Sequence, residues 1–437
     1  MESILLDNQT AEKMPDIKTT ILKRQMASQT IAGYVSMSFV VAGTMFCSGY
    51  VLSLAYPSSW RVGMLLLMCA VLVGRLLKHQ LKWFRCSRPV VIAYSLFIGM
   101  FLISMARNGS DGGYFIILLY LTTAVLTVLN FSFVNFKRTY VTCMKYITIV
   151  ALIFYAADLL FQIFSYFPIV YNSDNDNYAY RNAWIVFQFV EQSRGPIGIF
   201  WEPGVFCSFL LFGILLELYF PEEKSNLRII FLFSAGIILS RSTAGWLLLP
   251  CMIGSQFFRK RSLFGCLGII GGIGILLSVW FCFQEILEFL IGTNEQLFGK
   301  LADLDSKSTL TRLMSPYMNW LICLDAPIGG YGFREAGEKY LELLESNLYG
   351  NVDSQTSTSG FFLAGLGLGG GLYTLAWIWG VMKQTYFSIA CRISLLTICL
   401  IIVNKEPHTY LLCTYMLMFY LLDTHYSPRK SDASEQP

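Results

Sequence analysis

The chain has 437 residues, of which 55% are hydrophobic and only 14% charged, and its formal net charge is +4. Soluble domains carry about 25% charged residues, so this composition excludes an ordinary soluble enzyme, and no nucleic-acid partner is expected. The apolar residues form blocks long enough to cross a hydrocarbon core as helices, which takes roughly 20 residues each. The ten-residue alternation typical of a transmembrane barrel is absent.

The composition and the apolar blocks predict an all-α polytopic membrane protein with about twelve transmembrane helices. A tail of residues 1–30 precedes transmembrane helices 1–5 in residues 31–167, expected at about 31–54, 62–77, 89–106, 114–134 and 146–167. A loop of residues 168–196 precedes transmembrane helices 6–9 in residues 197–283, expected at about 203–220, 229–240, 246–258 and 262–283.

A second, larger loop covers residues 284–359 and is polar, but it contains short apolar stretches. These stretches predict short amphipathic helices near the membrane interface. Transmembrane helices 10–12 follow in residues 360–423, expected at about 360–382, 386–403 and 410–422, and residues 424–437 form a tail.

The basic residues predict the orientation of the chain. Clusters at Arg75–Arg88 and Arg259–Arg261 lie in connections on the same side as the N-terminus. Because Lys and Arg accumulate in cytoplasmic loops, both termini are expected in the cytoplasm. Both long loops then lie on the outer, periplasmic face.

The stretch from Arg194 to Phe206 leads from the first loop into an apolar block. Pro203 fits best as the first residue of a helix, and this places Glu202 just outside its N-terminus. By itself, Glu202 could simply interact with the positive end of that helix. The nearby Arg194 also makes a binding or catalytic site at this mouth a reasonable interpretation.

Two further segments carry arginines expected on the outer face. Arg241 lies in the turn of a short hairpin, where it could anchor at the headgroups or bind phosphate through its planar fork. In the large loop, Arg312 precedes the turn Pro327–Arg334, whose aromatic residues could stack on sugars. Asp353 begins a Ser/Thr-rich run that is expected to cap the next helix.

Several other features have both a structural and a functional interpretation. Asp158 lies within the fifth span, where a carboxylate is a functional candidate, although hydrogen bonding to a neighbouring helix together with Gln162 is the alternative. The glycines from Gly365 to Gly371 suggest close helix packing. The Asp-x-Asp triplets at Asp174 and Asp303 lie outside, where no nucleotide sugar is expected.

The order of these motifs resembles one membrane-protein family. An Arg-Gly-x-x-Gly-x-Phe-x-Glu-Pro-Gly mouth at 194–204 is followed by Ser-Arg-Ser-Thr at 240–243. Pro-x-Gly-Gly-Tyr-Gly at 327–332 and Gly-Leu-Gly at 365–367 complete the order. The chain is similar to the bacterial O-antigen polymerase and ligase superfamily, and it looks most like the Wzy-type polysaccharide polymerases. The motifs cover residues 194–382, and the topology covers the whole chain.

The resemblance implies a GT-C-like, metal-independent glycosyltransferase of the bacterial inner membrane, with no cofactor. Its substrate would be a repeat-unit oligosaccharide on undecaprenyl pyrophosphate, with a chain-length regulator protein as a further candidate partner. Family ligases carry a histidine shortly before the last Gly-rich span. This chain has Asp353–Gly360 there, and its three histidines are His79, His408 and His425. The departure favours a polymerase over a ligase and leaves the general base open.

The expected site residues follow from this reading. Glu202 and, second, Asp353 are the candidate catalytic bases. Arg194, Arg241 and Arg312 would neutralise the pyrophosphate. The sugar contacts are assigned to Trp201, Tyr331, Phe333 and Arg334. The alternatives are a ligase that transfers polymer to lipid A core and a transporter of the lipid-linked oligosaccharide, with Asp158 as the feature that favours transport.

Overall fold

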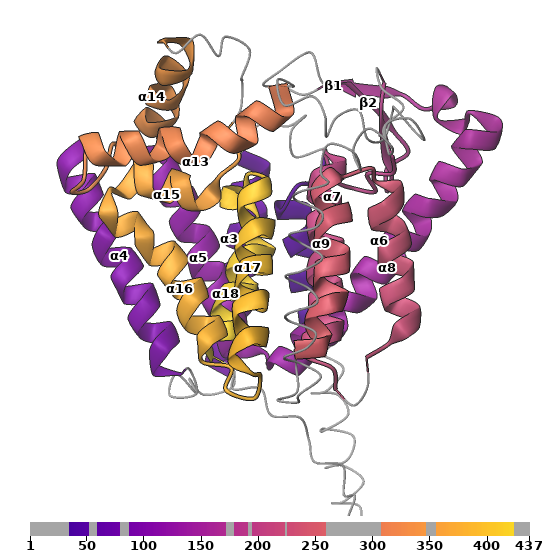
Figure 1. Ribbon diagram of the computed structural model, residues 1–437, viewed down its shortest axis with the longest axis horizontal. Helices are drawn as coiled ribbons and strands as arrows, with labels where there is room; N and C mark the ends of the chain where they lie inside the picture. The colour runs from indigo at the N-terminus through magenta and orange to yellow at the C-terminus, as the bar shows by residue number, and fades with distance from the viewer. Residues whose placement is uncertain are drawn as a thin grey trace, which may run out of the picture.

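A computed structural model describes residues 35–51, 59–78, 87–171, 179–190, 195–222, 225–258, 307–346 and 355–423. These residues form a mostly helical bundle whose helices run between two ends (Figure 1). Helices α13 and α14 lie beside one end of the bundle, which we call the upper end. The opposite end is the lower end. The helices of the bundle are, in chain order, Val35–Cys47, α3 (Ser59–Lys78), α4 (Arg88–Asn108), α5 (Gly112–Asn130), α6 (Phe133–Phe161), α7 (Pro203–Tyr219), α8 (Leu227–Leu239), α9 (Thr243–Gly254), α15 (Thr358–Leu366), α16 (Leu372–Met382), α17 (Ile389–Lys405) and α18 (Leu412–Asp423).

The remaining elements are short or lie at the ends of the bundle. Two further helices, α13 (Lys307–Asp325) and α14 (Phe333–Ser346), come from the second predicted loop. The 3-10 helices are η2 (Ile163–Tyr166), η3 (Ser255–Phe258), η4 (Leu368–Gly371) and η5 (His408–Tyr410). The strands are β1 (Ile169–Tyr171), β2 (Ala179–Asn182) and β3 (Phe187–Phe189).

Four helices of the described residues, α3 to α6, are long and apolar enough to cross a membrane. Large apolar side chains stay exposed on them, such as Leu66, Leu102 and Leu160, which suits contact with lipid better than contact with water. The other apolar helices of the bundle are shorter. A helical membrane protein is therefore supported, whereas the count of about twelve spans stays a prediction.

Two helices differ from the spans expected at residues 146–167 and 360–382. The fifth predicted span begins earlier, because Ser132 caps α6 and Lys137 lies inside the helix, paired with a carboxylate. The tenth span is not one helix. Gly367 has φ 65° and ψ −150°, and this left-handed backbone ends α15, while η4 separates it from α16. The described part of the first predicted loop contains the three strands.

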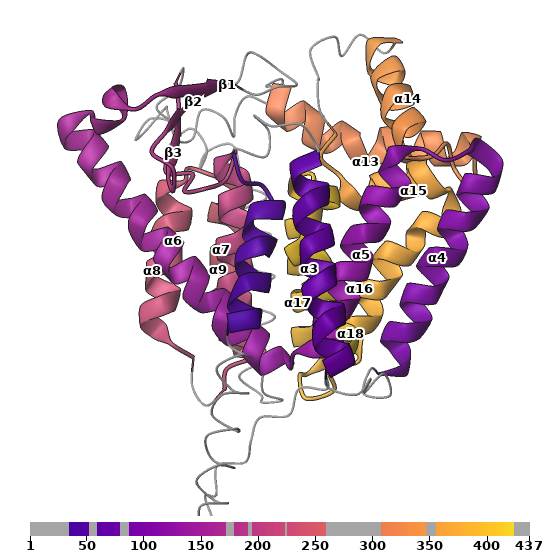
Figure 2. The same ribbon diagram turned by 180° about the vertical axis from the view of Figure 1, so that it is seen from behind.

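The strands form a small antiparallel sheet in the order β1-β2-β3 at the upper end (Figure 2). Val170 pairs with Tyr180, and Tyr180 pairs with Phe189, whose ring lies 4.8 Å from that of Tyr180. Aromatic and β-branched residues favour such a pleated, half-buried surface. The amide of Phe187 donates to the carbonyl of Gly198 at 2.9 Å, so the sheet holds the segment that leads into α7.

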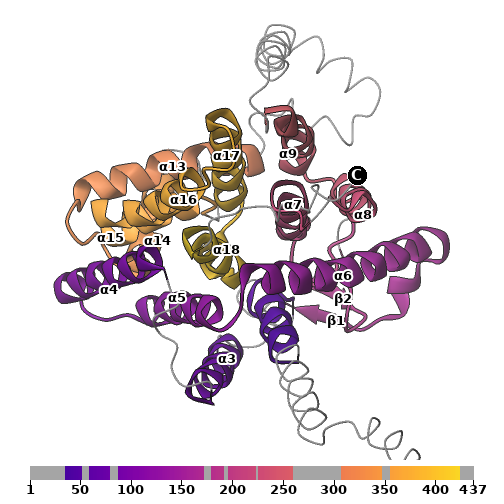
Figure 3. The same ribbon diagram turned by 90° about the horizontal axis from the view of Figure 1, so that it is seen from below.

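Helix α7 lies in the interior of the bundle, as the view along the bundle shows (Figure 3). Every residue from Pro203 to Tyr219 is buried. A helix that is apolar all round is expected in a core rather than at a surface. Gly213 allows the ring of Phe233 on α8 to approach closely, because a Cβ at this position would clash with that ring. The N-terminus of α7 is thereby held at a defined place at the upper end.

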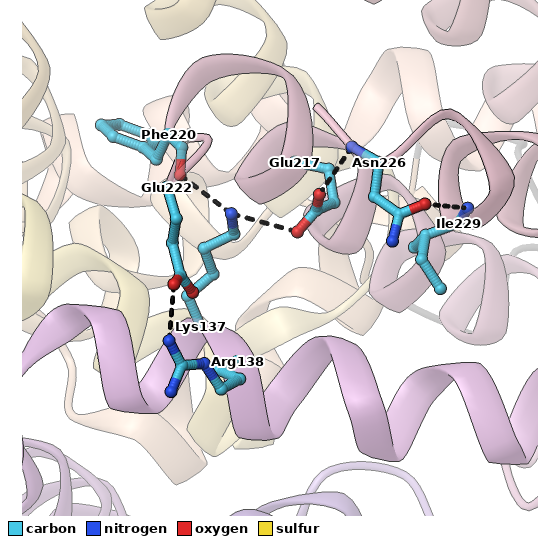
Figure 4. A network of polar contacts seen from close by, with 7 residues as sticks. All are labelled: Lys137, Arg138, Glu217, Phe220, Glu222, Asn226 and Ile229. Carbon is cyan, nitrogen blue, oxygen red and sulfur yellow. Dashed lines mark hydrogen bonds and ion pairs between the residues drawn. The ribbon is translucent and has the colours of Figure 1, made fainter. Parts of the chain in front are cut away.

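The lower end of α7 is held by a buried ion pair (Figure 4). The Lys137 ammonium on α6 lies 3.1 Å from the Glu217 carboxylate, and both side chains are less than 10% exposed. Lys137 also donates to the carbonyl of Phe220 at 3.0 Å. The second oxygen of Glu217 accepts from the amide of Asn226 at 3.2 Å. One charge pair therefore joins α6, the end of α7 and the start of α8.

Two of the glycine motifs of the sequence pack against each other. The amides of Tyr331 and Gly332 donate to the carbonyls of Ala364 and Gly365, at 3.1 and 2.9 Å. Gly330 lies directly on the backbone of Gly365, with no room for a Cβ. The glycine run therefore accommodates the turn of the upper loop, and it also allows the close helix packing that its composition suggested, because Gly369 lies against Met100 on α4.

We expect Gly330→Ala to destabilise the protein. The added Cβ would meet the backbone of Gly365, and the left-handed φ of 61° adds strain of roughly 1 kcal/mol for a residue with a side chain. The thermal unfolding midpoint should fall clearly. Gly337→Ala is the matched control, because a Cβ at that helical position would meet no neighbour within 4 Å. Equal midpoints in the two variants would contradict this account of the turn.

Candidate functional site

The N-terminus of α7 lies at the upper end, and the structure confirms its predicted start. Pro203 is the first helical residue, and Glu202 precedes it in an extended conformation with φ −148°. The half-buried Glu202 side chain accepts no capping hydrogen bond from α7. Trp201 packs against the turn at Gly49, to whose carbonyl its amide donates at 2.9 Å. The ring of Trp201 is thus half-buried by a structural contact.

The Arg241 hairpin lies directly beside this segment. Gly195 packs on the backbone of Leu239 and Ser240 so closely that a Cβ at residue 195 would clash. The turn between α8 and α9 leaves Arg241 exposed, with a left-handed φ of 54°. Backbone strain at a non-glycine residue is concentrated at functional sites, which draws attention to this arginine. The structure therefore brings together the predicted mouth and the predicted hairpin.

A third segment reaches the same place, and sequence reasoning missed it. It is the connection Lys405-Glu406-Pro407-His408 between α17 and α18. The buried Lys405 ammonium donates to the carbonyl of Gly204 at 2.9 Å. The buried Glu406 carboxylate lies against the α-carbon of Gly204, where any Cβ would overlap it. The signal in the sequence was a second Glu-Pro pair flanked by charges between two apolar blocks.

His408 links this connection to α7 through a chain of hydrogen bonds. Its Nε2 lies 3.2 Å from the Ser208 hydroxyl, which donates to the Gly204 carbonyl at 3.1 Å. Its Nδ1 lies 2.7 Å from the Thr414 hydroxyl. Because Ser208 already donates to Gly204, we assign the ring proton to Nε2, and Nδ1 then accepts from Thr414. His408 is therefore a neutral, fully buried link.

Complete burial and the neighbouring Lys405 ammonium hold the pKa of His408 well below its usual range. The folded state then keeps His408 neutral, while the unfolded chain takes up a proton near pH 6.5. Stability should accordingly fall as pH drops below about 6.5, by up to about 1.4 kcal/mol per pH unit for this group.

The measurement compares unfolding midpoints at pH 7.5 and pH 5 in the wild type and in His408→Gln. Glutamine keeps a donor for Ser208 but cannot titrate in this range. We expect a smaller loss of stability between the two pH values in the variant. An identical pH dependence in both proteins would show that His408 is not buried neutral.

A buried polar network extends from the same connection to α13. The amide oxygen of Asn404 accepts from the Ser357 hydroxyl at 3.1 Å and from the Ser359 amide at 2.8 Å. The Ser315 hydroxyl on α13 accepts from the Ser357 amide at 3.1 Å. Ser357 also caps α15, as the Ser/Thr run predicted. Hydrogen bonds therefore connect α13, the start of α15 and the end of α17.

The predicted sugar contacts of the second loop lie elsewhere, over the α4–α5 side of the bundle (Figures 1 and 3). The predicted role of Phe333 in stacking on a sugar is corrected by the structure. Its ring is buried among those of Phe101, Tyr114, Phe361 and Phe362. Its role is packing. An aromatic ring enclosed in this way has no free face for a ligand.

Tyr331 and Arg334 do line a surface pocket of about 360 Å³. The Tyr331 hydroxyl donates to Asp325, and this hydrogen bond raises the pKa of Tyr331. The Arg334 guanidinium lies 3.2 Å from Glu338, and its amide donates to Asp111. The pocket is also lined by Asn108, Glu335, Lys339 and Glu342.

The other predicted residues are placed as follows. Arg312 belongs to α13, which crosses the upper end. Arg194, Asp353 and both Asp-x-Asp triplets lie outside the described residues. Asp158 lies near the end of α6, where its oxygens accept from the amide of Phe164 at 2.9 Å and from the side chain of Gln188 at 2.6 Å. These bonds fit a structural role in joining α6 to the sheet.

The arrangement at the start of α7 combines several groups suited to an anionic substrate. The N-terminus of α7, the exposed Arg241 and the half-buried Glu202 lie at the same end of an apolar bundle. Helix N-termini and arginines favour phosphate groups, and a carboxylate can accept a proton. No protein-family model matches the chain, and no curated protein matches it either.

Proposed function

We propose that this chain is a Wzy-type polysaccharide polymerase of the bacterial inner membrane. The observation that carries the proposal is the contact of Gly195 with Leu239 and Ser240. It joins two motifs of the family resemblance, the Glu-Pro-Gly mouth and the Ser-Arg-Ser-Thr hairpin, at one end of an apolar helical bundle. Arginine and a carboxylate at such an end suit a substrate that has a lipid tail and a charged pyrophosphate.

In this proposal the shorter apolar helices also cross the membrane, about twelve in all with a GT-C-like arrangement, and the upper end faces the periplasm. The described lower end is rich in basic residues, which favours the cytoplasm by the positive-inside rule. These residues are Arg75, Lys78, Arg88, Lys137, Arg138, Arg228, Lys383 and Arg392. The N- and C-termini are then cytoplasmic.

The reaction would transfer a growing glycan from its carrier to a new lipid-linked repeat unit. A hydroxyl of the acceptor sugar attacks the anomeric carbon, and the bond from that carbon to the phosphate oxygen breaks. Undecaprenyl pyrophosphate leaves with the electron pair, and the hydroxyl proton passes to a carboxylate. Glu202 is the first candidate base, and Asp353 is the second. Arg241, with Arg312 and Arg194, would neutralise the leaving pyrophosphate without a metal.

Fewer residues are proposed to contact carbohydrate than the sequence suggested. Tyr331 and Arg334 line a pocket on the α4–α5 side and would contact repeat units away from the reacting sugar. Trp201, next to Glu202, remains a candidate contact through the exposed part of its ring. The Lys405–His408 connection would support the mouth from behind, because its side chains are buried against Gly204 and Ser208.

The test is a reaction of purified protein in vesicles with synthetic undecaprenyl-pyrophosphate repeat units. We expect a ladder of products that differ by one repeat, formed without added energy. Single transfer to lipid A core would indicate a ligase, and movement of the substrate across the vesicle without a new bond would indicate a transporter. Either result would overturn the proposal.

The same assay tests whether Glu202 acts as the catalytic base. We expect Glu202→Gln to lower the polymerisation rate by about 100-fold or more, in the range typical of general base catalysis. Full activity of this variant would leave Glu202 only a positioning role. Glu222→Gln, at an exposed carboxylate of the lower end, is the matched control and should polymerise like the wild type.

A further inference from the structure

Helix α13 is apolar on both of its sides, because its buried side contains Met318, Ile322 and Cys323 and its exposed side also carries large apolar residues. The buried side also contains two polar residues, Ser315 and Asn319, both inaccessible to solvent. Its exposed side contains Tyr317, Trp320 and Leu324, which are 54%, 43% and 54% exposed. The spacing of three and four residues places these three on one face of the helix. Such a face is unfavourable in water.

The polar groups on the buried side are used within the protein, so α13 cannot simply turn over. Ser315 accepts from the amides of Thr356 and Ser357, and Asn319 donates to the Ser315 carbonyl at 2.7 Å. Gln355 also donates to Asn319. These bonds hold α13 against the start of α15 and keep its aromatic face directed outward.

The exposed apolar strip continues down the side of the bundle. After Leu324 it reaches Ile328, which is 72% exposed and forms a β-bridge with Gly367. Leu368 comes next and is exposed, as is Leu375 on α16. The strip therefore joins the face of α13 to the apolar side of a bundle helix. Seen along the bundle, α13 lies on the outer rim (Figure 3).

The height of α13 matches the upper boundary of a hydrocarbon core. Asn319 packs against Gly360 at the start of α15, and the exposed Trp379 lies near the end of α16. With rises of about 1.5 Å per residue in α15 and α16 and about 2.0 Å in η4, the chain from Gly360 to Trp379 has a length of roughly 30 Å along its helices. A hydrocarbon core is about 30 Å thick. Trp and Tyr side chains favour the two boundaries of that core.

We propose that α13 lies in the upper interfacial layer of the bilayer, with Tyr317, Trp320 and Leu324 seated among the lipid headgroups and upper acyl chains. The occupant of this surface is the lipid leaflet. The inference needs only that the bundle is embedded in a membrane, and it does not depend on the polymerase proposal. In this position α13, the helix that contains Arg312, lies at the level of the lipid phosphates.

The experiment uses the full chain in phosphatidylcholine nanodiscs that contain lipids with a photoactivatable diazirine. One lipid carries the group near the glycerol, and the other carries it at the end of the acyl chain. Crosslinked peptides are mapped by mass spectrometry. We expect the shallow probe to label the segment 317–324 and the deep probe to label Leu375 on α16. The exposed carboxylates of α14, Glu338 and Glu342, are the internal control and should stay unlabelled.

Two outcomes would overturn the proposal. One is labelling of Leu375 with no more label on 317–324 than on α14, which would place α13 in water. The other is labelling of 317–324 by the deep probe alone. A Trp320→Glu, Leu324→Glu variant provides a second measurement, and we expect it to lose at least about half of the shallow labelling relative to Leu375. Unchanged labelling in that variant would show that other residues provide the contact.

Discussion

Replacing Arg241 by glutamate is expected to abolish polymer formation, with a loss of at least about 100-fold. Removing one preorganised charge donor from a transition state typically lowers the rate by about 100- to 1,000-fold, and a carboxylate at the same place would also repel the pyrophosphate. The side chain is exposed beside the mouth of α7, so the substitution touches the substrate more than the fold. The measurement is the product ladder in vesicles.

A second substitution separates function from folding. Arg241 has a left-handed φ of 54°, which glycine adopts without penalty. Arg241→Gly should therefore keep or raise the thermal unfolding midpoint while losing polymerisation. Arg181→Glu is the matched control, because this half-buried arginine of the sheet donates only to the Ser165 carbonyl among the contacts described. Wild-type chain length in Arg241→Glu would remove Arg241 from the proposed site.

Replacing Glu217 by alanine is expected to destabilise the folded protein by about 3–5 kcal/mol. The substitution leaves the Lys137 ammonium buried without its carboxylate, and an uncompensated buried charge has a cost of this size. The measurement is unfolding in mixed micelles with increasing dodecyl sulfate. The Asn226 amide also loses its acceptor at the start of α8, which adds to the effect.

The double variant Lys137→Met, Glu217→Leu tests whether the unpaired Lys137 charge causes the loss of stability in Glu217→Ala. Apolar residues of similar volume often replace a buried ion pair without loss, so the double variant should recover much of the stability. Glu222→Ala is the control, because its pair with Arg138 is exposed and should contribute less than about 1 kcal/mol. A Glu217→Ala effect no larger than that of Glu222→Ala would contradict the inferred role of the buried pair.

Local sequence rules predicted individual elements well. The start of α7 at Pro203 follows from the missing N–H and the preset φ of proline, and the cap of α15 at Ser357 follows from its hydroxyl. The break of the tenth span at Gly367 was missed, because a run of glycines is compatible both with close helix packing and with a left-handed turn. The structure contains both, because Gly367 is left-handed against Pro327 and Gly369 lies against Met100 on α4.

Distant contacts were beyond the reach of sequence reasoning. Phe333 and Tyr331 are two residues apart in an aromatic turn, yet Phe333 is buried in the core and Tyr331 is only half-buried and lines a surface pocket. Nothing in the local pattern distinguishes them, because α4, α5 and α15 supply the surrounding rings. Asp158 was a candidate for transport, and its partners on η2 and β3 became visible only in three dimensions.

The sequence alone determined that this is an apolar helical chain, and it determined at which residues many of the helices begin. It also determined that the Glu202 mouth and the Arg241 turn are polar breaks between apolar blocks. These properties depend on residues close in the chain, through helical periodicity, capping and the length of apolar runs. The tertiary structure alone decided that the two breaks touch and that Lys405 and His408 support the first of them, at Gly204 and Ser208, from a segment about 200 residues away. The physical reason is that burial of a charged or polar group depends on partners, and those partners come from distant helices.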